Sequence, residues 1–207
     1  MVVYCIRHGD KEKGDYYNDS IGQNDQPLSS FGIQQSHQLV HYFESIDIKR
    51  IFVSSYKRTF QTIEKVCLAK DIKPISNPLI NEIDCGSYSK LNSEMQNKKY
   101  PDIVKLLKER NKDFKYPDGE SGHDVIVRIK KFFEILGEQD TNAIVVTHEG
   151  WLKCLVCYLL NLDPGKRFQL YMNTCGITEI EKYEYSNFWQ IKRINQILYE
   201  YRKEMDY

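Results

Sequence analysis

The sequence predicts an α/β fold: a three-layer α/β/α sandwich with a mostly parallel central sheet and a small helical lid insertion. Short apolar runs alternate along the chain with longer segments whose apolar residues recur at helical spacing. That alternation is typical of a parallel sheet covered by helices on both faces. The 207 residues suffice for one full hydrophobic core, so we expect a single domain over residues 1–207.

The first strand and helix are marked by a change from apolar to polar residues and back. Residues 2–6 form a short apolar run, which predicts a buried strand, and the polar segment 10–28 predicts a loop. Ser29 is expected to cap the helix that follows. The apolar residues on the inner face of this helix are Leu39, Val40 and Phe43.

A second strand and helix repeat the pattern. Residues 51–53 predict a buried strand, and a helix is expected after Ser55. The apolar residues at helical spacing in this helix are Phe60, Ile63 and Val66. A further strand is expected near residues 73–75.

The second half of the chain begins with the predicted insertion. Residues 87–119 are rich in lysine and tyrosine and poor in aliphatic residues, which predicts a lid over a site rather than core. Ser121, supported by Asp124, is expected to cap the next helix. Residues 143–147 form the clearest strand, and an apolar helix follows His148. We expect one or two strands within 177–193 and a charged or frayed helix over 194–207.

Composition excludes several classes of function. Acidic and basic residues balance at 29 each, which argues against nucleic-acid or membrane-surface partners. No stretch approaches the roughly 18 apolar residues of a membrane span, and the apolar run near the N-terminus is too short for a signal peptide, so we expect a cytoplasmic protein. Cys154 and Cys157 form a CxxC without a second ligand pair. We interpret them as core residues, with a redox pair as the alternative.

Three predicted strands end in residues suited to binding an anion. These endings are Arg7-His8-Gly9, Ser54 to Arg58, and His148-Glu149-Gly150. The carboxyl ends of parallel strands meet at one edge, so two arginines and two histidines should gather there. Arginine pairs with phosphate through two parallel hydrogen bonds, and the helix start after Ser55 is expected to add backbone N–H groups.

The same residues suit phosphoryl transfer without a metal or cofactor. A neutral histidine can attack phosphorus, and the surrounding cations stabilise the charge of the transition state. The leaving oxygen needs a proton, for which Glu82, Asp84 and Glu149 are the candidates. Neither His37 with His41 nor any other cluster has the ligands of a metal site, so none is expected.

Six segments together resemble the histidine phosphatase superfamily, in the branch with phosphoglycerate mutases and small phosphatases. The segments occur in the family's order and span most of the chain. They are Arg7-His8-Gly9, Asp25 to Gly32, Ser54 to Thr62, Asn81 to Gly86, Pro117 to Ser121, and Val145 to His148.

The resemblance implies a role for each site residue. His8 would be the nucleophile. The phosphoryl oxygens would be held by Arg7, Arg58 and His148, and His148 would donate a hydrogen bond to the transferring group. Glu82 would be the general acid. Further candidates at the site are Gly9, Ser55 and Glu149. Glu149 remains an alternative acid because related acid phosphatases carry a carboxylate after the second histidine, where the commonest pattern has glycine.

Three functions are compatible with these residues. The favoured one is phosphomonoester hydrolysis through a phosphohistidine, because the loop Glu82 to Gly86 lacks the arginine typical of the mutases. The alternatives are mutase-type phosphoryl transfer and non-catalytic binding of a phosphorylated ligand. A small phosphorylated metabolite is the expected substrate, with a phosphoprotein as the alternative. Further residues are candidates for contacting the substrate: Lys11, Asn18, Ser20, His123 and the lysines of 87–119.

Overall fold

The computed structural model describes residues 1–183 and 188–198 and contains one six-stranded sheet. In sheet order the strands are β5 (Ile75–Ser76), β4 (Arg50–Val53), β6 (Ala143–Thr147), β1 (Val2–Arg7), β7 (Ile177–Lys182) and β8 (Trp189–Gln196). Strands β5, β4, β6 and β1 run parallel, whereas β7 is antiparallel to β1 and to β8. The predicted fold class, with its mostly parallel sheet, is therefore confirmed.

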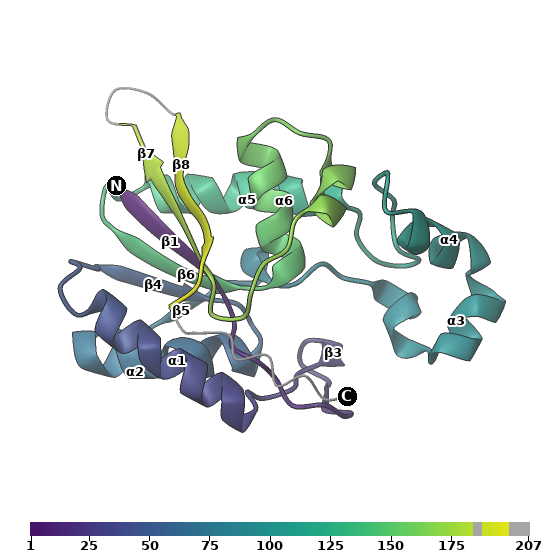
Figure 1. The fold of residues 1–207 in the computed structure, drawn as a ribbon, viewed down its shortest axis with the longest axis horizontal. Helices are drawn as coiled ribbons and strands as arrows, with labels where there is room; N and C mark the ends of the chain where they lie inside the picture. Colours follow the sequence, from purple (N-terminus) through teal and green to yellow (C-terminus); the bar gives the residue numbers. More distant parts are fainter. Residues whose placement is uncertain (184–187, 199–207) are drawn as a thin grey trace.

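Two helices cover each face of the sheet (Figure 1). Helices α1 (Ser30–Phe43) and α2 (Lys57–Lys70) lie on one face, and α5 (Gly122–Gly137) and α6 (Glu149–Leu159) lie on the other. The sheet residues alternate between two buried clusters, as the two-residue period of a strand requires. In β1, for example, Val3 and Cys5 belong to one cluster and Tyr4 and Ile6 to the other.

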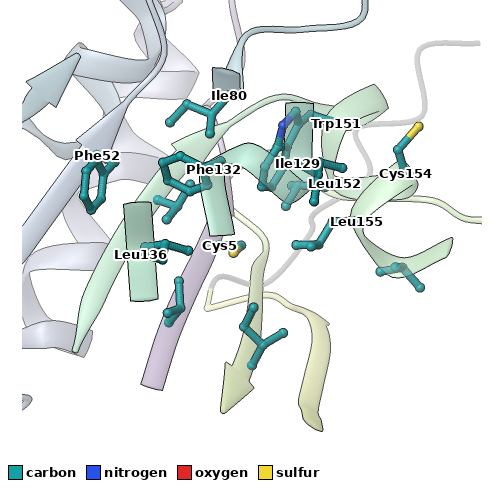
Figure 2. Close-up of a cluster of buried hydrophobic side chains, with 14 of the residues drawn as sticks. Cys5, Phe52, Ile80, Ile129, Phe132, Leu136, Trp151, Leu152, Cys154 and Leu155 are labelled. Carbon is teal, nitrogen blue, oxygen red and sulfur yellow. The ribbon is translucent and has the colours of Figure 1, made fainter. Parts of the chain in front are cut away.

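The cluster beneath α5 and α6 contains the bulkiest core residues (Figure 2). Trp151 and Phe132 are fully buried, and their rings meet edge to face with centroids 6.1 Å apart. Cys154 and Cys157 are buried free thiols, in agreement with the predicted core role. Burial raises the pKa of the Cys154 thiol to about 12, which disfavours the reactive thiolate.

The two predicted N-caps form as expected. The Ser29 side chain accepts the Gly32 N–H, and Ser121 forms a reciprocal capping box with Asp124. One helix face was assigned wrongly: Phe60 of α2 is 41% exposed. Its spacing from the buried Ile63 and Val66 places it at the edge of the apolar stripe, where neighbouring elements decide whether it is covered.

Two connections also differ from the predictions. The segment 10–28 was expected to be a loop, but it contains a short hairpin formed by β2 (Tyr17–Asn18) and β3 (Gln23–Asn24). The segment 194–207 was expected to be helical or frayed, but Ile194 to Gln196 complete β8 by pairing with β7. Residues 199–207 lie outside the described part of the chain.

The predicted helical insertion is confirmed as a separate unit beside the three layers (Figure 1). It contains the 3-10 helix η2 (Gly86–Lys90) and helices α3 (Ser93–Lys99) and α4 (Pro101–Glu109), and neither α-helix has a buried residue. A Cβ at Gly86 would collide with the Pro117 carbonyl, so the two ends of the insertion pack backbone against backbone. Two further 3-10 helices are η1 (Pro78–Ile80) and η3 (Pro164–Gln169). Within the described ranges, no helix has both the length and the apolar character needed to cross a membrane.

Candidate active site

The structure brings the predicted polar strand ends together at one edge of the sheet. Strands β4, β6 and β1 are neighbours, and the residues that directly follow them are Ser54, His148 and His8. The His8 N–H donates to the Thr147 carbonyl at 3.0 Å, which extends the parallel ladder by one residue. The imidazole rings of His8 and His148 consequently lie with their centroids 5.1 Å apart.

Hydrogen bonding leaves one nitrogen of His8 free to react. His8 is buried, and its Nδ1 lies 2.7 Å from the Gly9 carbonyl oxygen. A carbonyl can only accept, so Nδ1 carries the proton and Nε2 keeps its lone pair. Burial is the main reason that the pKa of His8 lies well below its usual value, and the positive charges of Arg58 and Arg7 lower it further. His8 is therefore neutral near pH 7, as a nucleophile must be.

His148 takes the opposite tautomer. An Arg58 guanidinium nitrogen, Nη2, donates to His148 Nδ1 at 3.2 Å, so Nδ1 accepts and the proton lies on Nε2. Nε2 donates to the Ser54 hydroxyl oxygen at 2.8 Å. Burial, and then the charge of Arg58, lower the pKa of His148 well below its usual value. His148 can donate to an anion only after Nδ1 gains a proton, and a nearby negative charge would favour that gain.

The two arginines retain buried donors without acceptors. In the described part of the chain, Arg58 Nε and Nη1 and Arg7 Nε form no hydrogen bond. The Asp25 carboxylate lies 3.9 Å from Arg58 Nη1, too far for a hydrogen bond, and the Tyr56 ring lies 4.3 Å from the guanidinium carbon. Leaving charged donors unsatisfied is costly. An anion with several acceptor oxygens would satisfy them.

Glu82 and Glu149 have different environments. Burial raises the pKa of Glu82, and this exceeds the opposing effects of the Ile83 N–H and the nearby arginines, so its carboxyl group keeps its proton to a higher pH than an exposed glutamate does. Both Glu149 oxygens face cations: Oε2 lies 3.2 Å from Arg7 Nη2, and Oε1 lies 2.5 Å from Lys153 Nζ. Glu149 is thereby engaged in orienting Arg7, whereas Glu82 has the properties of a proton donor.

One sequence-based expectation about this site is wrong. The start of α2 was expected to offer backbone N–H groups to the anion, with Ser55 beside them. Instead, the Ser55 N–H donates to the Asn81 side chain at 2.8 Å, and the Lys57 N–H donates to Asp25 Oδ1 at 2.8 Å. Protein side chains thus occupy these backbone donors. The donors that still lack an acceptor are the guanidinium nitrogens Arg7 Nε, Arg58 Nε and Arg58 Nη1.

Sequence reasoning missed two supporting residues. Asp25 is buried and accepts the Lys57 N–H, which anchors the first turn of α2 and hence Arg58. Arg128 of α5 donates to the carbonyl oxygens of Leu79 and Glu82 at 2.7 and 3.1 Å and so holds the backbone of the Glu82 loop. The sequence could have indicated Arg128, because it lies one helical turn beyond the inward-facing Val125 and so on the same side of the helix.

The other histidines lie away from the site. His37, His41 and His123 are exposed, and the His123 N–H donates to Asp113. Gly9 is a positioning element: its N–H donates to the Thr62 hydroxyl at 2.9 Å, and a Cβ there would lie 2.8 Å from a backbone oxygen. Among residues 1–183 and 188–198, no three His, Cys, Asp or Glu side chains are grouped closely enough to hold a metal ion.

Among the cavities that Glu82 lines, two of similar volume adjoin the site. One, of about 560 Å³, is also lined by Arg58, Tyr56 and residues of the first loop, including Lys11. The other, of about 580 Å³, is lined by Glu149 and Lys153 of α6, and by residues of the insertion and η3. Both volumes fall within the usual range for small-molecule sites.

An α/β sandwich that places guanidinium groups with unused donors and a neutral histidine at the carboxyl edge of its sheet is typical of enzymes that bind and transfer phosphoryl groups. The chain belongs to the histidine phosphatase superfamily (branch 1), whose sequence profile matches residues 3–197. The family identified from the six motifs is therefore confirmed.

Curated relatives include two kinds of enzyme. The rat 6-phosphofructo-2-kinase/fructose-2,6-bisphosphatase 3 is 32% identical over 164 residues, which cover 77% of this chain but 28% of that larger protein. A probable phosphoglycerate mutase of Enterobacter is 27% identical over 186 residues, covering 89% of this chain and 86% of the relative. This chain thus spans about a third or less of the bifunctional relatives' length.

Solved structures share the whole fold. The alpha-ribazole phosphatase of Shigella flexneri has a TM-score of 0.78 at 17% identity, covering 95% of this chain and 96% of that one. The mycobacterial glucosyl-3-phosphoglycerate phosphatase in complex with inorganic phosphate has a TM-score of 0.78 at 18% identity, covering 95% and 98%. At these identities the similarity concerns the fold.

Proposed function

We propose that this chain hydrolyses small phosphomonoesters through a covalent phosphohistidine on Nε2 of His8, without a metal ion. The observation that carries the proposal is the set of buried guanidinium donors on Arg7 and Arg58 that lack acceptors beside a neutral His8. A phosphoryl group supplies the missing acceptor oxygens and is the electrophile that a neutral imidazole attacks.

In the first step, the His8 Nε2 lone pair forms a bond to phosphorus while the bond from phosphorus to the ester oxygen breaks. Glu82 gives its proton to the departing oxygen, which leaves as an alcohol. Arg7 and Arg58 stabilise the charge that spreads over the phosphoryl oxygens. The charge of the phosphate also favours protonation of His148 at Nδ1, after which this nitrogen can donate to the transferring group.

In the second step, the Glu82 carboxylate takes a proton from a water molecule as the water oxygen attacks phosphorus. The phosphorus–nitrogen bond breaks, the electron pair returns to His8 Nε2, and inorganic phosphate leaves. The raised pKa of Glu82 suits this alternation between acid and base. Glu149 has a different part in this scheme, because its ion pairs hold Arg7 in place.

A small phosphorylated metabolite is the proposed substrate class. Structural neighbours are named for phosphatases that act on alpha-ribazole phosphate and glucosyl-3-phosphoglycerate. The cavity of about 560 Å³ beside Arg58 is of a size that accepts such a compound. We propose a cytoplasmic location, which is compatible with six free cysteines in a reducing compartment.

The test is phosphate release from a panel of phosphomonoesters in the presence of a chelator. Wild type is expected to release phosphate, His8→Ala is expected to release none, and the matched control His37→Ala, on an exposed helix face, should resemble wild type. Rapid denaturation during turnover should trap protein-bound phosphate that is acid-labile and absent from His8→Ala. Activity that survives in His8→Ala, or that the chelator abolishes, contradicts the proposal.

A mutase is the second candidate because of the similarity to the Enterobacter protein along most of both chains. A mutase would return the phosphoryl group from His8 to a hydroxyl group of the bound compound instead of to water. Incubation with 2- or 3-phosphoglycerate separates the two functions: interconversion without phosphate release favours the mutase. Binding of phosphorylated compounds with neither reaction favours a binding protein.

A further inference from the structure

The cavity beside Arg58 and Glu82 has a positive lining beyond the groups that the proposed reaction uses. Its walls carry the cations Lys11, Arg58 and Lys90 against the carboxyl groups of Asp15 and Glu82. Even with both carboxyl groups ionised, the three cations outnumber them, so the lining is positive overall. The two lysines, Lys11 and Lys90, neither hold the phosphoryl group nor transfer a proton in the two reaction steps.

Lys11 is held in place by its backbone. It pairs with Leu28 in an isolated antiparallel bridge, and the Glu12 N–H donates to the Pro27 carbonyl at 2.9 Å. Its ammonium group donates to the neutral side-chain oxygen of Gln26 at 3.1 Å. An ammonium group has three donors, so two remain for a ligand in the cavity.

The Lys11 charge acts within the reaction site. Its positive charge contributes to lowering the pKa of both His8 and His148. Desolvation by surrounding protein atoms, followed by repulsion from Arg58, lowers the pKa of Lys11 itself, although its side chain is accessible from the cavity. An anionic ligand group would relieve that repulsion.

The reaction geometry determines which part of a substrate reaches Lys11. The proton donor Glu82 must lie beside the leaving oxygen, and Glu82 and Arg58 both line the Lys11 cavity. The leaving group therefore extends into this cavity. In the cavity lined by Glu82 and Glu149, Lys153 is already paired with Glu149, and Arg167 with Asp113. Arg110 also lines this cavity, and its Nε donates to the Leu107 carbonyl at 3.2 Å. Those cations are less available to a substrate.

We propose that the leaving group of the substrate carries a second anionic group, a carboxylate or a second phosphate, which Lys11 binds while Lys90 lines the same cavity. This inference rests on the proposed phosphatase function and specifies its substrate class. Lys11 acts here as a specificity-determining residue of the first loop. The phosphoryl group itself is held by the arginines.

The experiment compares pairs of substrates that differ in one charge. Each ω-carboxyalkyl phosphate, in a series of increasing tether length, is assayed beside the ω-hydroxyalkyl phosphate of the same length, and alkanediol bisphosphates form a third series. The readout is the ratio of kcat/KM within a pair, because any effect on the shared phosphoryl step cancels. The variants are Lys11→Gln and the matched control Lys13→Gln, an exposed lysine of the same loop.

We expect wild type and Lys13→Gln to prefer the anionic member of the best pair by about tenfold, the usual value of one hydrogen bond to a charged group. Lys11→Gln should reduce that ratio to near one. The bisphosphates show whether phosphate replaces carboxylate. A wild-type ratio near one at every tether length, or a ratio that Lys11→Gln leaves unchanged, overturns the inference while phosphatase activity stands.

Binding separates this inference from the proposed function. Dissociation constants for the same pairs are measured by calorimetry on His8→Ala and on His8→Ala with Lys11→Gln. If wild type hydrolyses no ester, the phosphatase proposal fails for these compounds, but the binding ratios still decide the role of Lys11. Equal affinities for both members of every pair overturn it, and a charge preference that Lys11→Gln removes supports it.

Discussion

Gly150 lies against the proposed proton donor, so Gly150→Ala should reduce catalysis more than stability. A Cβ at this position would lie 2.5 Å from Glu82 Oε1 and 2.8 Å from Ile83 Cγ2, whereas ordinary contacts begin at 3.4 Å. The Glu82 carboxyl must therefore move by about 1 Å, a displacement that can cost roughly 10²-fold in rate. The carboxyl is the end of a flexible side chain, and alanine favours helix α6 by up to about 1 kcal/mol relative to glycine. The thermal midpoint should therefore change little.

The assay uses two substrates that differ in their need for an acid. A simple alkyl phosphate has a poor leaving group and should lose about 10²-fold in kcat/KM, whereas p-nitrophenyl phosphate should lose much less. Gly137→Ala is the matched control, because a Cβ there meets no atom within 4 Å. If Gly150→Ala retains full activity on the alkyl phosphate with an unchanged thermal midpoint, the position of Glu82 does not limit catalysis and the reasoning is refuted.

Four further predictions follow from the same geometry. Glu82→Gln should lower kcat/KM for alkyl phosphates by about 10²–10⁴-fold and for p-nitrophenyl phosphate by much less; the same pattern in Glu149→Gln instead would identify Glu149 as the acid. Arg58→Ala should lower kcat/KM by about 10²–10³-fold and abolish the rise in thermal midpoint that added phosphate gives wild type; a retained rise would remove Arg58 from the phosphate site. The lowered pKa values of His8 and His148 predict that kcat/KM is maintained as the pH falls through 6.5 and declines only at lower pH. On the alkaline side, turnover of alkyl phosphates should decline as the pH rises through the raised pKa of Glu82, because the acid then loses its proton. If kcat/KM instead falls on the acid side at or above pH 6.5, the two histidines are not held neutral by burial. Because the unfolded chain binds these histidine protons more readily, the free energy of unfolding should also decrease as the pH falls below 6.5.

Local patterns were sufficient for the elements that carry the site. The apolar runs of β1 and β6 and the serine caps of α1 and α5 appear in the structure as the sequence predicts. Burial period and capping depend on neighbours within a few residues, so they can be recognised along the chain. Since β1 and β6 are both buried and parallel, the polar residues at their carboxyl ends had to meet at one edge.

Local sequence patterns could not predict the hairpin of the first loop or the exposure of Phe60. Residues 17–24 are polar and carry no alternating apolar pattern, and their position depends on distant partners. Gln23, for example, donates to Asp84 at 2.7 Å, and Asn18 donates to Asp25 at 3.1 Å. Phe60 has helical spacing, but it stays 41% exposed in the folded structure.

The sequence by itself determined the fold class, the edge of the sheet at which the site forms, and the identity of the histidines and arginines gathered there. Only the tertiary structure decided their chemical state. The tautomer of His148 depends on Arg58, which is 90 residues away in the chain, and the occupied N–H of Lys57 depends on Asp25. The contrast between Glu82 and Glu149 likewise depends on burial and on ion pairs that form after folding. Protonation and hydrogen-bond satisfaction are set by groups that are close in space but distant in sequence, so no local pattern encodes them.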